Sequence, residues 1–103
     1  MSQSLVPADQ LEAVAQRFRL LGEPVRLELL GTLHDAGELS VGELVEATGH
    51  RQANVSKHLS LMAEDGLVTR NRDGVHVYYA IDDPTVSALC LLVSTQVEQE
   101  AAE

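Results

Sequence analysis

The chain has 103 residues, of which 45% are hydrophobic and 22% charged, and it carries a formal net charge of −9. This length fits one domain over residues 1–103, and the lone cysteine, Cys90, excludes an internal disulfide. No positively charged and then apolar signal opens the chain, and its longest apolar run, 89–93, is far too short to span a bilayer. We therefore expect a cytoplasmic protein without membrane contact.

Two amphipathic helices are predicted in the first third of the chain. The first opens at 7–9 and ends at Gly22, because apolar residues recur between them at helical spacing: Leu11, Val14, Ala15, Phe18 and Leu21. The second begins at Pro24, which the first turn of a helix tolerates, and it stops at 36–37. With three aromatic residues in the whole chain, the core must consist mostly of Leu, Val and Ala.

A short extended segment and two more helices follow. Residues 38–40 are expected to be extended, and Ser40 with Glu43 has the spacing of a capping box that starts a third helix. Gly49 ends that helix. A fourth helix is predicted from about Arg51 to Asp65, with an inward face at i, i+4 and i+7 that consists of Val55, Leu59 and Met62.

A hairpin and a final helix complete the chain. Strands are predicted at 67–71 and 75–81, the second alternating with Val75, Val77, Tyr79 and Ile81 on one face. Asp73-Gly74 is a strong turn signal between them. Asp82 or Asp83 caps a last helix that has Pro84 in its first turn. The predicted order, α-α-β-α-α-β-β-α, is mainly α with a small β-hairpin wing and is typical of a winged helix-turn-helix domain.

The third and fourth helices form the predicted helix-turn-helix unit, whose second helix enters the major groove of DNA. Its outward face is polar: Arg51, Gln52, Ala53, Asn54, Ser56 and Lys57. Gln and Asn bond bidentately to adenine and Arg to guanine, while Ser and Lys suit phosphates. The competing interpretation is an ordinary solvated helix face, although the absence of any Asp or Glu from 47 to 63 is unusual for one.

The net charge of −9 argues against nucleic acid, since most DNA-binding domains are basic. Four of the seven basic residues nevertheless fall between 51 and 72, which leaves a locally positive strip on an acidic body. In the wing, side chains that could reach phosphates or the minor groove are Arg70, Arg72 and His76. A stabilising hairpin with incidental charges is the alternative for each of them.

The last helix carries more apolar surface than a monomer can bury. One stripe consists of Val86, Leu89, Cys90, Val93 and Val97, and a second of Ala88, Leu91 and Leu92. We expect one stripe to pack on the domain, against the first helix, and the other on a second copy of the chain. A two-fold dimer would place two reading helices about 34 Å apart, one turn of DNA.

Four segments together resemble the ArsR/SmtB family of bacterial winged-helix repressors: 21–30 (LGEPVRLELL), 52–59 (QANVSKHL), 61–68 (LMAEDGLV) and 72–79 (RDGVHVYY). The resemblance covers about residues 10 to 97. It implies repression through a palindromic operator, release on a signal, and a homodimer joined through the first and last helices, with Leu11, Val14 and Phe18 in the interface. It also assigns DNA contact to His58, although a half-buried structural histidine beside Leu59 is an equal alternative.

The chain departs from the family at its sensing positions. Many members carry two cysteines where this sequence has Ser40 and Gly42, and others carry histidines in the last helix, where this one has only Asp82 and Asp83 near its start. The histidines at 34, 50, 58 and 76 are scattered. We therefore predict no metal and no cofactor, and Cys90 is more simply a small buried hydrophobe than a thiol switch.

The effector stays unidentified. A winged-helix protein-interaction module, or a regulator modulated by a partner protein, is the alternative function, and its main support is the net charge. No nucleophile-base pair, phosphate loop or paired carboxylates predict an enzyme.

Overall fold

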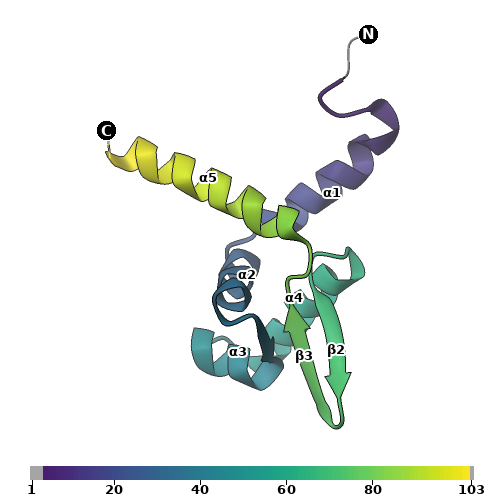
Figure 1. Ribbon diagram of the computed structural model, residues 1–103, viewed down its shortest axis with the longest axis vertical. Coiled ribbons are helices and arrows are strands. Elements are labelled where there is room, and N and C mark those ends of the chain that lie inside the picture. The colour runs from purple at the N-terminus through teal and green to yellow at the C-terminus, as the bar shows by residue number, and fades with distance from the viewer. Residues whose placement is uncertain (1–3, 103) are drawn as a thin grey trace.

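The order of elements in the computed structural model, which describes residues 4–102, is the predicted winged helix-turn-helix order (Figure 1). A 3-10 turn precedes the first helix. The elements are η1 (Ala8–Gln10), α1 (Leu11–Leu21), α2 (Pro24–Ala36), β1 (Glu38–Ser40), α3 (Val41–Thr48), α4 (Gln52–Glu64), β2 (Thr69–Asp73), β3 (His76–Ala80) and α5 (Pro84–Ala102). The predicted fold class is confirmed.

The short extended segment before α3 is a strand of a three-stranded antiparallel sheet with the order β1-β3-β2. Leu39 of β1 lies opposite Tyr79 of β3, and on the other side of β3 Arg70 of β2 lies opposite the same tyrosine. The central strand therefore joins a segment that precedes the helix-turn-helix unit to one that follows it.

The hairpin turn is shorter and later than predicted. Arg72 and Asp73 pair with Val77 and His76 inside the ladder, so the loop is Gly74-Val75 rather than residues 72–74. Gly74 has φ +65°, and Val75 does not have a positive φ. A positive φ at the first loop residue alone is what a type II′ turn requires. Val75 is consequently 91% exposed at the tip, and its predicted place as the first residue of the second strand was wrong.

The core lies where α2, α3 and α4 meet the sheet. Its fully buried side chains come from α2, α3, α4 and the segment just before β2: Leu29, Leu33, Leu44, Val55, Leu59, Met62 and Leu67. Leu67 and Val68 were predicted to begin the first strand of the hairpin; they lie before β2 and are buried. Tyr79 from β3 and Val86 from the start of α5 close the cluster.

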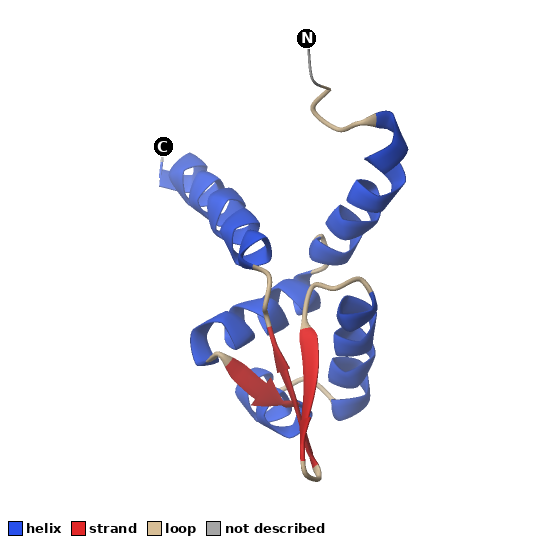
Figure 2. Cartoon of the chain, turned by 45° about the vertical axis from the view of Figure 1, so that its right-hand side comes forward, coloured by secondary structure: helices blue, strands red, loops and turns tan. Residues whose placement is uncertain are grey.

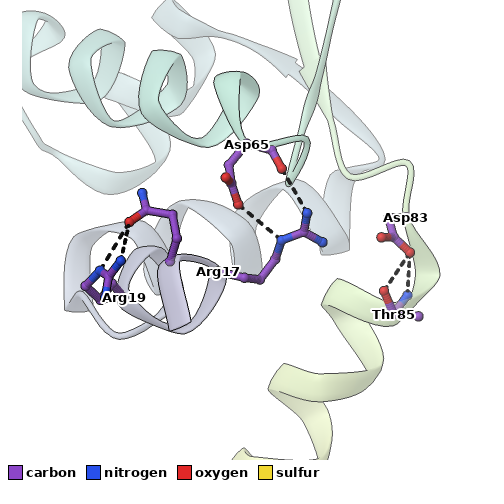
Figure 3. Close-up of polar contacts among 6 residues, drawn as sticks. Arg17, Arg19, Asp65, Asp83 and Thr85 are labelled. Carbon is purple, nitrogen blue, oxygen red and sulfur yellow. Dashed lines mark hydrogen bonds and ion pairs between the residues drawn. The ribbon is translucent and has the colours of Figure 1, made fainter. Parts of the chain in front are cut away.

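Helix termini follow the local signals in the sequence. The Ser40 hydroxyl accepts a hydrogen bond from the Glu43 backbone N–H at 3.2 Å, and the Glu43 carboxylate accepts one from the Ser40 N–H at 2.9 Å, which completes the capping box. At α5, Asp83 rather than Asp82 is the cap, because its carboxylate accepts from the Thr85 N–H at 2.9 Å and the Thr85 hydroxyl at 2.7 Å (Figure 3). These bonds lower the pKa of Asp83.

Helices α1 and α5 diverge from one end of the domain, while the hairpin projects from the other (Figures 1 and 2). The radius of gyration is 15.4 Å, against about 13 Å for a compact chain of 100 residues. Helix α5 packs on α2, so the expectation that it packs on the first helix of the same chain was wrong. No helix among residues 4–102 is long and apolar enough to cross a membrane.

Replacing Ser40 with Ala should lower the free energy of unfolding by about 1 kcal/mol, because it removes the acceptor for the Glu43 N–H. Urea denaturation at one fixed protein concentration measures this, since association also stabilises a folded chain. Ser60→Ala, an exposed mid-helix change in α4, is the matched control and should be neutral or slightly stabilising. Equal midpoints for the two variants would show that the capping box contributes nothing.

Candidate nucleic-acid interface

Helices α3 and α4 pack together and form the predicted helix-turn-helix unit. The turn between them depends on Gly49, whose φ of +77° lies in the left-handed region that favours glycine. Burial of Val55, Leu59 and Met62 fixes the rotation of α4 about its own axis. The opposite side of the helix therefore faces outward.

The first turns of α4 present the predicted polar residues to solvent. Arg51, Gln52, Ala53, Asn54 and Lys57 are exposed, and Ser56 is half-buried. With Gly49 and His50, four of them line one shallow open depression: Arg51, Ala53, Asn54 and Lys57. Arg51 provides no side-chain cap, and there is no acidic residue in the first turn. The helix thus offers N–H groups and neutral or cationic side chains, which suit a polyanion.

The seven cations divide into two groups. Arg17, Arg19 and Arg26 are held by hydrogen bonds to carboxylate, amide, carbonyl and imidazole groups. In residues 4–102 the other four form no ion pair or side-chain hydrogen bond: Arg51, Lys57, Arg70 and Arg72. The positive strip that the sequence predicts is therefore available to an external anion.

The wing residues do not share one face. Residues directly opposite in an antiparallel pair have their side chains on the same side of the sheet. Arg70 lies opposite Tyr79 and Arg72 opposite Val77, which puts the two arginines on one face. His76 lies on the other face, where its ring centroid is 6.1 Å from that of Tyr78. Of the three predicted wing residues, Arg70 and Arg72 therefore share one face of the hairpin, and His76 lies on the opposite face.

The position of His58 favours the structural alternative over DNA contact. The side chain is buried, with 9% exposure. Arg26 Nη1 lies 3.1 Å from His58 Nδ1. Because a guanidinium only donates, Nδ1 accepts and the ring proton is on Nε2. Burial chiefly lowers the pKa of His58, and Arg26 and Lys57 add to this effect against an opposing contribution from Glu23.

Arg26 and His50 support the helix-turn-helix unit through side-chain contacts that were not predicted from the sequence. Arg26 precedes buried Leu29 and Leu30 by three and four residues, so it lies beside the inward face of α2. A half-buried charge there needs a partner, and this was the available signal. His50 Nε2 lies 2.7 Å from Glu28 Oε1 and joins the turn of the unit to α2. The sequence carries no local signal for that contact.

The predicted dimer residues differ in exposure. Leu11, Phe18, Val93 and Val97 are exposed, and Val14, Leu89 and Cys90 are half-buried. Five of them, Phe18, Leu89, Cys90, Val93 and Val97, line an open, largely apolar groove of about 930 Å³ between α1, α2 and α5, whereas Leu11 and Val14 do not. Val86, which the sequence also places in the interface, is only 2% exposed and packs in the core of its own chain, so it has little surface left for a partner.

The possible sensing groups are dispersed. In the described part of the chain, no three His, Cys, Asp or Glu side chains gather closely enough to hold a metal ion. His34 Nδ1 contacts the Ser87 hydroxyl at 3.2 Å. Burial raises the pKa of the Cys90 thiol, which favours the protonated and less reactive form.

Comparison with known proteins shows the same architecture elsewhere. Residues 21–71 match a helix-turn-helix domain family. A probable mercury resistance operon repressor of Streptomyces lividans is 37% identical over 94% of this chain and 77% of its own length. The antimony-specific repressor AntR has a TM-score of 0.85 at 27% identity, covering 100% of this chain and 93% of its own. A homodimeric winged helix-turn-helix domain of Mycobacterium bovis, described as a possible ArsR-family regulator, has a TM-score of 0.82 at 31% identity, covering 96% and 91%.

The buried histidine makes a prediction for the pH dependence of stability. As the pH falls below about 6.5, the unfolded chain protonates residue 58 while the folded chain, with its lowered pKa, does not. The free energy of unfolding should therefore fall from pH 7.5 towards the lowered pKa of His58 and then level off. His58→Gln keeps a neutral acceptor and should lose this part of the decline. Parallel stability curves for the two proteins would contradict the assignment.

Proposed function

The chain belongs to the ArsR/SmtB family of winged helix-turn-helix, DNA-binding transcriptional repressors, and on this premise we propose that it binds a palindromic operator as a homodimer. Helix α4 lies in the major groove and the β2–β3 hairpin beside it. The observation that carries the proposal is the exposed, acid-free start of α4, which combines amide side chains with cations that have no partner in the described chain.

The residue types on α4 match the donors and acceptors of base edges. Gln52 and Asn54 can each bond bidentately to adenine and Arg51 to guanine, while the Ala53 methyl suits the methyl group of thymine. Lys57 and Ser56, one turn further along, reach the phosphates. Arg70 and Arg72 on one face of the wing contact the backbone on the same side.

The acidic body does not prevent this mode of binding. Repulsion between distant acids and DNA is screened beyond about 10 Å at 0.1 M salt, whereas cations in direct contact release counterions from the DNA. The net charge of −9 instead disfavours non-specific association, because only the face with the positive strip attracts a duplex.

The exposed faces of α1 and α5 support the homodimer. Phe18 is 55% and Val93 56% exposed in the single chain, and both line the apolar groove. A second copy related by a two-fold axis places its own α1 and α5 on these faces and buries the same patch on both chains. The two α4 helices then lie about one helical turn of DNA apart.

The effector is proposed not to be a soft metal or metalloid, although two similar proteins are named for mercury and antimony. Ser40 and Gly42 stand where many family members have thiols, and the Ser40 hydroxyl is already engaged in the capping box. Asp83, at the start of α5, is engaged with Thr85 (Figure 3). Neither position supplies the thiolate or imidazole that such ions select.

Fluorescence anisotropy with a duplex from the region upstream of the gene, against a scrambled duplex at two salt concentrations, tests DNA binding. Gln52→Ala and Asn54→Ala should each weaken binding to the upstream duplex by about 1–3 kcal/mol, because each removes a bidentate base contact. Gln99→Ala, on the exposed end of α5, is the control and should bind as the wild type does. Weak, unselective binding by the wild type at both salts would instead favour a protein-interaction module.

Val93→Glu should dissociate the homodimer, because the two-fold axis buries each new carboxylate against apolar side chains without a cation. Sedimentation velocity at micromolar concentration measures the change. Val75→Glu adds the same charge at the exposed wing tip and should sediment as the wild type does. An unaltered sedimentation coefficient for Val93→Glu would place the interface elsewhere.

A further inference from the structure

Two arginine side chains connect the α1–α2 corner of the domain to α4. Arg17 of α1 donates from Nε to Asp65 Oδ2 at 3.2 Å and from Nη2 to the Asp65 carbonyl at 3.0 Å, at the end of α4 (Figure 3). Arg26 of α2 donates from Nε to the Leu20 carbonyl at 2.7 Å and from Nη1 to His58 in the middle of α4. One guanidinium thus bridges the last turn of α1 and the interior side of the reading helix.

The Arg17–Asp65 and Arg26–His58 contacts lie at two separate points along α4, so together they restrain the direction of its axis. His58 and Asp65 are separated by seven residues, which is about 10 Å along a helical path. Helix α1 packs mainly on α2, whereas α4 packs on α2 and α3, so the α1–α4 relation is transmitted through α2 and through these hydrogen bonds. Together with the packing of α4 on α2 and α3, hydrogen bonds at two separated points restrict the angle between α4 and α1 more than one such point would.

We propose that Arg26 is a positioning residue for DNA recognition, which sets the angle between α4 and the dimerisation helix α1 through its bonds to His58 and the Leu20 carbonyl. This inference rests on the proposed function. The spacing of the two reading helices in a homodimer depends on that angle, because α1 belongs to the interface and α4 to the groove. Hydrogen bonds to base edges weaken steeply with misalignment, so a small rotation at each α4 weakens both half-sites together.

The geometry separates this role from a direct DNA contact. The Arg26 side chain is half-buried, and its Nε and Nη1 atoms are engaged with acceptors inside the chain. His58 is buried at the edge of the core face of α4, one turn after the exposed Asn54. A residue that neutralises a phosphate changes the slope of log affinity against log salt, whereas a positioning residue leaves the slope unchanged and lowers the affinity at every salt concentration.

Four variants of the full chain test the proposal with the upstream duplex across a salt series. Arg26→Met and His58→Leu should each lose at least tenfold in affinity with the slope of the wild type. Arg19→Met removes an equal charge from an exposed α1 arginine that contacts only Gln16 and Glu12 through its side chain, and it should bind within twofold of the wild type. His58→Gln, which keeps an acceptor for Arg26 in a side chain about the size of Leu, should retain most of the affinity.

The double variant Arg26→Met/His58→Leu should lose no more affinity than the worse single variant, because both changes break the same bond. Arg26→Met at wild-type affinity, a salt slope reduced by about one, or equal losses for His58→Gln and His58→Leu would each overturn the proposal. If Arg26→Met does not fold, the Gln and Leu pair at position 58 decides it. If the wild type does not discriminate between the upstream and scrambled duplexes, both the proposed function and this inference are wrong. If the wild type binds selectively and Arg26→Met binds equally well, only this inference is wrong.

Discussion

The burial of one side of α4 is the constraint on which the rest of the domain depends. Val55, Leu59 and Met62 have no exposed surface, and they are packed from α2, α3 and the start of the hairpin. Side chains on the opposite side of a helix must then face away from the core. The outward face can thus vary without disturbing the core, and here its first turns are polar and without acids.

That same core leaves the two ends of the chain without enough neighbours. The helices that meet in the core use nearly all the apolar faces of the middle of the sequence, and α1 and α5 extend beyond it with apolar residues in solvent (Figure 2). A domain of this size buries a limited share of its surface on its own, so association is the way to cover the remainder. Stability and DNA recognition are then linked through the same pair of helices.

Much of the architecture could be predicted because its signals are local. The capping box at Ser40, Gly49 after α3 and the i, i+4 spacing of Val55 and Leu59 each concern a few consecutive residues, and each holds in the structure. The exposure of the polar residues on α4 follows from the same spacing. The differences depend on tertiary position: the hairpin turn lies at 74–75 and exposes Val75, α5 packs on α2, and His58, for which the sequence left two roles open, is buried beside an arginine 32 residues away in sequence. The spacing of apolar residues along the sequence does not predict which distant side chain a buried polar group will contact.

The central position of β3 has a consequence for how this kind of domain can diverge. The segment from 41 to 68 contains the whole helix-turn-helix unit, follows β1 and precedes β2, and both of these strands pair with β3. The two ends of the segment are therefore held by one strand, and most of its outward side chains take no part in the sheet or in the helices that form the proposed dimer. Substitutions on the outward face of α4 can therefore change the operator sequence that such a protein binds while the sheet and the dimerisation helices stay the same. Paralogues in one cell can in this way come to bind different promoters.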